Sequence, residues 1–127
     1  KKINLRLFAF IILIFSTLFI FHTDELYASE SVDSTLIKKV SRSYTKKFCN
    51  SIGFGLSKES SMNFSLKENN QVFNKRKNFK DINKEALAEE IAIGVIEKCG
   101  YPIKLSGENG IMEFKNYYLS KDKESTE

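Results

Sequence analysis

The chain has 127 residues, a formal net charge of +4 and a single histidine. This length corresponds to one domain. The mild positive charge falls well short of the strongly basic surface of a nucleic-acid-binding domain, so nucleic acid is excluded as an expected partner.

The first 28 residues have the order of a secretory signal peptide. Lys1, Lys2 and Arg6 precede residues 7–21, which carry no charge, and small residues follow. This apolar run is shorter than the roughly 20 residues that a membrane-spanning helix needs. We therefore expect a signal peptide over residues 1–28, cut after Ala28, with a cut after Ser31 as a second option. An uncleaved membrane anchor formed by residues 5–21 is the alternative.

Residues 36–52 are predicted to form the first helix of the mature chain. Apolar residues recur there at steps of three or four, which is helical periodicity: Ile37, Val40, Tyr44, Phe48 and Ile52. Ser31 or Asp33 is the expected cap at the start. Gly53 and Gly55 are expected to end the helix.

A second, shorter helix is predicted over about residues 58–68, because Ser57 is a suitable N-cap and Glu59 suits a first turn. Residues 69–80 are polar and basic and are predicted to form a loop. Val72, Phe73 and Phe79 are the residues expected to hold this loop against the core.

The third helix has the clearest signals. It is expected to begin after Asp81 or Asn83 and to run to Cys99, where Gly100 and Pro102 follow. Its apolar residues form a wide face, so we expect it at the centre of the fold: Leu87, Ala88, Ile91, Ala92, Val95 and Ile96. Ser106 is expected to open a last helix with Ile111, Phe114, Tyr118 and Leu119 inward, and residues 121–127 are expected to be a charged, flexible tail.

These elements predict an all-α fold, a small four-helix domain over residues 29–120. Cys49 and Cys99 are the two cysteines, and in an exported chain they are expected to form a structural disulfide. The bridge closes a loop of about 50 residues, which corresponds to roughly 4 kcal/mol in the chain-entropy description. A redox-active pair is the less favoured alternative, since the C-x-x-C spacing is absent.

The residue inventory favours a protein that is not an enzyme. His22, the single histidine, lies in the segment expected to be removed, so histidine-based nucleophilic catalysis and histidine metal sites are not expected. We expect no metal and no cofactor. Glu85, Glu89 and Glu90 share one helix, and carboxylates on one helical surface do not face each other across a cleft. They are interpreted as a solvated face.

Three features are candidate partner contacts. Phe54 lies between two glycines and is interpreted first as a plug of the core, with presentation to a partner as the alternative. Lys75, Arg76 and Lys77 form the densest basic stretch, interpreted first as a solvated loop and otherwise as a contact for an acidic protein or a lipid headgroup. Tyr117 is expected to point outward from the last helix, and tyrosine is common at binding surfaces.

Two stretches, residues 44–66 (YTKKFCNSIGFGLSKESSMNFSL) and residues 97–120 (EKCGYPIKLSGENGIMEFKNYYLS), resemble small uncharacterised exported proteins of cyanobacteria. The resemblance implies a periplasmic or thylakoid-lumen address and is compatible with an accessory role at a photosynthetic membrane complex. The layout of a small helical domain with two bridged cysteines about 50 residues apart is also similar to that of periplasmic acid-stress chaperones.

The sequence therefore suggests a non-enzymatic interaction module that docks on a partner protein or a membrane complex. Phe54, Lys75, Arg76, Lys77 and Tyr117 are its candidate contacts. The alternative is a stress protein that binds unfolded clients in a chaperone-like way.

Overall fold

The computed structural model describes residues 24–125, with side chains from Asp33 onward. The expected anchor at residues 5–21 and His22 lie outside the described residues. The chain divides into two compact units, residues 1–32 and residues 33–127. Of the first unit, only the helical stretch 24–32 is described, and everything below concerns the second.

Four helices make up the described part of the chain, and no strand occurs within it. They are α2 (Asp24–Gly53), α3 (Lys58–Phe73), α4 (Lys84–Cys99) and α5 (Gly107–Glu124). This confirms the predicted all-α fold. The first helix begins well before the expected caps Ser31 and Asp33, because no glycine or proline between Asp24 and Leu36 interrupts helix propagation.

Local sequence signals determine where α3 and α4 begin. The Ser57 side chain accepts a hydrogen bond from the Ser60 backbone N–H at 3.1 Å, and Asn83 Oδ1 accepts one from the Ala86 N–H at 3.0 Å. Both caps agree with prediction, because these short polar side chains satisfy N–H groups that have no intrahelical partner. α3 nevertheless extends to Phe73, past the predicted end near residue 68, since Asn69 and Phe73 also face the core.

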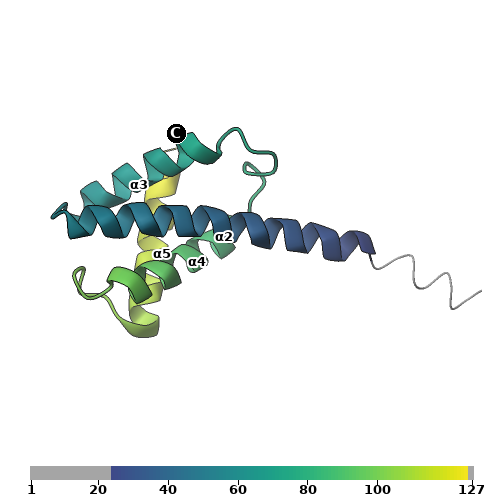
Figure 1. Cartoon of the computed structure of the whole chain (residues 1–127). Helices are drawn as coiled ribbons and strands as arrows, with labels where there is room; N and C mark the ends of the chain where they lie inside the picture. The colour runs from purple at the N-terminus through teal and green to yellow at the C-terminus, as the bar shows by residue number, and fades with distance from the viewer. Residues whose placement is uncertain (1–23, 126–127) are drawn as a thin grey trace, which may run out of the picture. The chain divides into compact units, whose positions relative to one another are not determined.

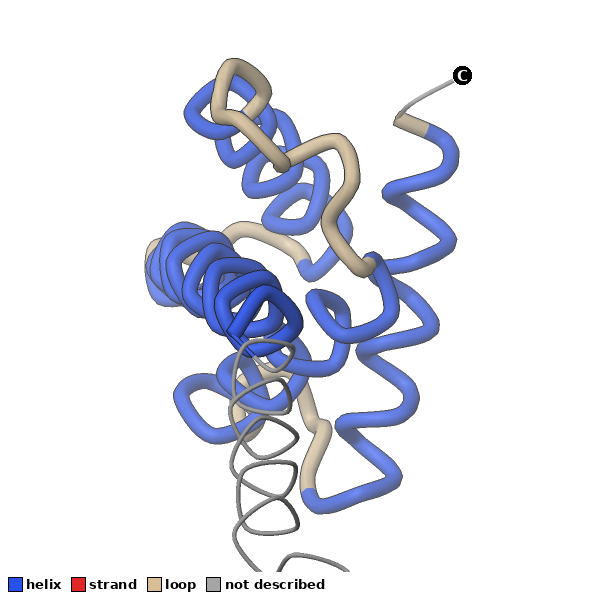
Figure 2. Tube along the Cα trace, turned by 90° about the vertical axis from the view of Figure 1, so that its right-hand side faces the viewer, coloured by secondary structure: helices blue, strands red, loops and turns tan. Residues whose placement is uncertain are grey.

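Aromatic side chains of α2 and α5 form the centre of the core. The Tyr44 and Tyr118 rings meet edge to face with their centroids 5.2 Å apart, and the Phe48 and Phe114 rings do so at 5.1 Å. This geometry suits the ring quadrupoles. Figure 2 looks nearly along α2 and shows α5 running across the side of the other helices, while Figure 1 shows α3 on one side of α2 and α4 on the other.

α4 is central, as its wide apolar face predicted. Leu87, Ala88, Ile91, Ala92 and Val95 are all buried. A close approach between α4 and α2 occurs at Gly94, where an added Cβ would lie only 2.9 Å from Thr45 Oγ1. A larger residue here would force Thr45 to shift, so glycine suits this contact for a steric reason and not for its backbone angles.

The predicted disulfide joins Cys49 to Cys99, with the two Cα atoms 5.6 Å apart. It fastens the C-terminal ends of α2 and α4 together. The α2–α3 turn and the α4–α5 connection therefore lie at the same end of the domain, and the α3–α4 connection lies at the other end of α3 (Figure 1).

The C-terminal segment differs from the expected flexible tail. α5 continues to Glu124, and Asp122 is buried. Its Oδ2 accepts a hydrogen bond from Lys84 Nζ at 2.7 Å. The charged composition of residues 121–124 was misleading because one of these charges has a partner on α4, which local sequence cannot show.

Candidate interaction surface

An apolar hollow lies at the α2–α3 turn, with a volume of about 400 Å³. Its lining residues come from the end of α2, the turn and the first half of α3: Lys47, Asn50, Ser51, Phe54, Leu56 and Phe64. Three of these are large apolar side chains that water reaches, with Phe54 85% exposed, Phe64 45% and Leu56 42%. We call this site the turn hollow.

The local sequence explains why Phe54 protrudes. The Leu56 N–H donates to the Ser51 carbonyl at 3.1 Å and the Gly55 N–H donates to the Ile52 carbonyl at 3.0 Å, while Gly55 has a φ of +89°. This is the pattern of a Schellman motif with glycine in the left-handed conformation. The tight turn closes without Phe54 entering the core, so the interpretation of Phe54 as a core plug is wrong.

Lys47 brings a positive charge to the edge of the turn hollow. Its Nζ donates a hydrogen bond to Ser43 Oγ, one helical turn earlier, at 2.6 Å. The Phe48 and Cys49 side chains beside it are buried, so the last turn of α2 is held by both core packing and the disulfide. The turn hollow is therefore carried by a well-supported part of the fold.

The basic stretch Lys75, Arg76 and Lys77 lies in the α3–α4 connection, and all three side chains are exposed. Arg76 sits over the Phe73 ring, with its guanidinium carbon 5.3 Å from the ring centroid, and Phe79 stacks on Phe73 at 6.0 Å. Phe73 and Phe79 thus hold this connection, as expected, whereas Val72 is 52% exposed. The basic stretch and Phe54 are at opposite ends of α3 and do not form one site.

Tyr117 was expected to point outward, but it is only partly exposed and packs against the core. The ammonium group of Lys58 lies over its ring, 5.2 Å from the centroid. Burial is the main reason that the pKa of the Tyr117 hydroxyl is raised, with a contribution from Glu59. Its ring is covered by Lys58, so it offers less surface to a partner than Phe54 does.

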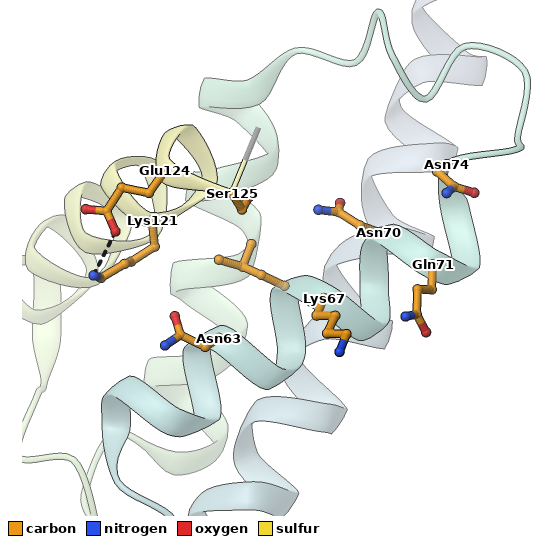
Figure 3. A pocket seen from close by; sticks show the side chains of 9 residues that line it. Asn63, Lys67, Asn70, Gln71, Asn74, Lys121, Glu124 and Ser125 are labelled. Atoms are coloured by element: carbon orange, nitrogen blue, oxygen red, sulfur yellow. Dashed lines mark hydrogen bonds and ion pairs between the residues drawn. The ribbon is translucent and has the colours of Figure 1, made fainter. Parts of the chain in front are cut away.

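A second, polar groove of about 510 Å³ separates α3 from the end of α5. Figure 3 shows Asn63 and Asn70 of α3 on the side toward α5, which carries Lys121 and Glu124, while Gln71 points away from α5. Lys121 Nζ donates to Glu124 Oε2 at 2.9 Å, which raises the pKa of Lys121. The groove offers neutral hydrogen-bonding groups, the ammonium group of Lys67 and one ion pair, which is a poor basis for acid–base chemistry.

The carboxylates of α4 have a cationic neighbour that the sequence did not reveal. Lys115 of α5 places its Nζ 3.2 Å from both Glu85 Oε2 and Glu89 Oε2. The hydrogen bond to Glu89, followed by that to Glu85, raises the pKa of Lys115. Both carboxylates are more than half exposed, so this arrangement is a surface ion-pair network. Among the described residues, no group of three His, Cys, Asp or Glu side chains is arranged to hold a metal ion.

Sequence reasoning found Phe54 but missed Leu56, Phe64 and Lys47. The Gly-Phe-Gly-Leu stretch at 53–56 contains part of the signal, since a glycine that can take the left-handed conformation marks the end of a helix directly after Phe54. The sequence could not show whether Phe64 faces the core or solvent, because Met62, Phe64 and Leu66 are spaced two residues apart, which does not fit one face of a helix. Met62 and Leu66 face the core, and Phe64 faces solvent.

Comparison with protein-family models, with curated proteins and with solved structures gave no match. In the part of the chain that the structure describes, none of the helices is both long enough and apolar enough to span a membrane.

Proposed function

We propose that this protein is a non-enzymatic interaction module that docks on a larger protein or membrane complex through the turn hollow. The observation that carries the proposal is the 85% exposure of Phe54 in a turn that backbone hydrogen bonds and the nearby disulfide hold in place. Because the backbone of this turn is already held in place, a partner that covers Phe54 does not have to order the chain that carries it. Such residues dominate the energetics of many interfaces.

The size of the expected effect follows from the exposed apolar area. Covering a Phe or Leu side chain fully contributes about 1.5–3 kcal/mol. Phe54 together with the exposed parts of Leu56 and Phe64 therefore supports a moderate affinity, to which polar contacts from Lys47 and Asn50 at the rim of the turn hollow would add.

The proposed address is outside the cytoplasm, in a periplasm or a thylakoid lumen. Two features support it. Residues 1–28 have the order of an export signal, and the Cys49–Cys99 disulfide is typical of oxidising compartments. The resemblance of residues 44–66 and 97–120 to exported cyanobacterial proteins is consistent with both.

Site-specific photocrosslinking in the native cells tests the docking proposal. A benzophenone amino acid replaces Phe54 in one variant of the full chain and Met112 in a matched variant, since Met112 is 61% exposed but lies on α5. We expect one or a few defined protein adducts, or an adduct with lipid, from position 54 and none from position 112. Equal yields from both positions, or neither kind of adduct at position 54, would contradict the proposal. A broad ladder of adducts at position 54 would favour the client-binding alternative.

A second measurement separates the candidate contacts. Phe54→Ser is expected to release the protein from its complex on native gels of gently solubilised membranes. Lys75→Gln, Arg76→Gln and Lys77→Gln, made together, are expected to leave it bound, because these residues lie at the far end of α3. If only the triple variant were released, the basic stretch and not the turn hollow would be the docking site.

A further inference from the structure

A row of cations follows the solvent face of α2. Lys38, Arg42 and Lys46 are spaced four residues apart, so their side chains share one face of the helix, and Lys39 lies beside them. All four side chains are exposed. None of them forms an ion pair with another residue that the structure describes. We call these four residues the α2 ridge.

The stretch of sequence that carries the α2 ridge contains basic residues and no acidic ones. Between Ser34 and Lys58 the sequence has five Lys or Arg residues and no Asp or Glu. Glu90 and Glu97 of α4 line a shared groove with Arg42 and Lys46 but form no ion pair with them. The ridge therefore remains a positively charged surface.

The α2 ridge leads along the helix to the turn hollow. From Lys38 to Phe54 the helix rise corresponds to about 24 Å. Lys47 and Asn50, in the last turns of α2, form the near rim of the hollow. The same part of the domain thus presents a row of unpaired cations that ends in exposed apolar side chains.

We propose that the α2 ridge and the turn hollow together bind the surface of an anionic lipid bilayer. The ridge lies over the negatively charged headgroups, and Phe54 and Leu56 enter the boundary between headgroups and acyl chains. Basic residues combined with exposed apolar side chains are the physical signature of such interfacial binding. This inference rests on the proposed function, because it names what the turn hollow docks on.

Two observations favour lipid over an acidic protein. Three of the four ridge cations are lysines. Their flexible point charges need no fixed geometry of the anion and so suit a fluid layer of headgroups, whereas the rigid fork of arginine suits a carboxylate or phosphate held in one place. Phe54, at 85% exposure, protrudes from its turn and needs no shape-matched cavity in a partner.

The absence of tryptophan from the sequence allows a local test on the full chain. Phe54→Trp introduces a single fluorescent reporter at the turn hollow, and Met112→Trp introduces a matched reporter on α5. Each variant is titrated with phosphatidylcholine vesicles and with vesicles containing 70% phosphatidylcholine and 30% phosphatidylglycerol. Because the reporter is local, binding of residues 7–21 to the vesicles does not by itself change the signal.

We expect a blue shift of the Phe54→Trp emission, and quenching by brominated lipid, on the anionic vesicles only, with no change for Met112→Trp. Adding Lys38→Gln, Arg42→Gln and Lys46→Gln to Phe54→Trp should weaken insertion by about 100-fold, since each cation near an anionic surface contributes about fivefold. Replacing Lys75, Arg76 and Lys77 by glutamine removes the same amount of charge but should weaken insertion less than threefold. All these side chains are exposed, so the variants are expected to fold, which circular dichroism checks.

Each other outcome overturns the inference. Equal weakening by the two triple variants would mean that net charge alone drives binding. An unshifted reporter on anionic vesicles, with a defined protein adduct from the crosslinker at position 54, would reject lipid but keep the docking proposal. A blue shift of the Phe54→Trp emission with polyglutamate, but not with vesicles, would identify an acidic protein as the class of partner. No signal in either experiment would reject both proposals.

Discussion

The side-chain Nδ2 of Asn69 donates a hydrogen bond to the main-chain carbonyl of Val40, 3.1 Å away, and thereby connects α3 to α2 inside the core. Asn69 is only 4% exposed, and its Oδ1 has no hydrogen-bond partner among the described residues. A buried amide of this kind makes position 69 sensitive to the chemistry of its side chain.

Replacing Asn69 by Asp should destabilise the fold by several kcal/mol at pH 7, because an ionised carboxylate would be buried beside a carbonyl oxygen. Burial raises the pKa of such a carboxyl, so the variant should regain stability as the pH falls through that raised pKa and the acid form donates to Val40. Urea unfolding between pH 4 and pH 8 measures this. A variant as stable as the native protein at pH 7 would contradict the burial of Asn69.

The disulfide should account for a large part of the stability of this small domain. Replacing Cys49 and Cys99 together by alanine is expected to lower the free energy of unfolding by about 4 kcal/mol, since the unfolded chain regains the freedom of a loop of about 50 residues. Denaturant unfolding measures the change. Reductant should have the same effect on the native protein and no effect on the double variant. A native protein insensitive to reductant would show that the bridge contributes nothing.

Gly94 should not tolerate alanine, although alanine normally favours a helix by about 1 kcal/mol. The new Cβ would lie 2.9 Å from Thr45 Oγ1, and overpacking of this kind costs about 1–3 kcal/mol. Gly94→Ala is therefore expected to be destabilising, and Thr45→Ala is expected to rescue it in a double-mutant cycle. Gly53→Ala is the matched control, because nothing lies within 4 Å of its added Cβ. Additive effects at positions 94 and 45 would mean that the helices do not meet there.

Alkaline pH should unfold the domain through its buried tyrosines. Burial, followed by the charge of neighbouring groups, raises the pKa of both Tyr44 and Tyr118 in the folded state above the unfolded value of about 10. The contribution of these two tyrosines to folding stability is fully present below a pH of about 10 and is lost as the pH rises toward their folded-state pKa values. The limiting slope is about 1.4 kcal/mol per pH unit for each tyrosine.

Tyr44→Phe tests this pH dependence. The variant loses the hydrogen bond from the Tyr44 hydroxyl to the Met62 sulfur, 2.7 Å away, so it should be slightly less stable at pH 7. Its stability should then fall less steeply above pH 10, because one ionisable group is gone. Thermal melts from pH 8 to pH 12 compare the two proteins. Identical alkaline slopes would show that Tyr44 does not titrate on unfolding.

The end of α5 should contribute to stability through Asp122. Asp122→Ala is expected to cost about 1–2 kcal/mol, because a buried carboxylate and its hydrogen bond from Lys84 are lost. Glu113→Ala is the matched control, since the Lys58–Glu113 pair is 3.8 Å apart and exposed on both sides, and such pairs contribute little. Equal effects of the two substitutions in thermal unfolding would indicate that α5 frays before Asp122.

The helices and the cysteine pairing were predictable because their signals are local. The apolar period from Ile37 to Ile52 and the Asn83 cap of α4 depend on residues within one or two helical turns, and helix formation responds to neighbours at that range. The pairing of Cys49 with Cys99 followed because the sequence has two cysteines. The all-α class of this protein was therefore contained in the sequence by itself.

Only the tertiary structure decided which side chains are covered. Phe54 is exposed although it is apolar, Asn69 is buried although it is polar, and Asp122 is buried in a segment expected to be a tail. The exposure of Phe54 follows from the local turn that ends α2. For Asn69 and Asp122 the outcome depends instead on a helix distant in the sequence, because burial is a property of the packed neighbours and not of the residue. For the same reason the candidate contacts Phe54 and Lys75 lie at opposite ends of α3, while Lys47, Phe54 and Phe64 come together in one hollow.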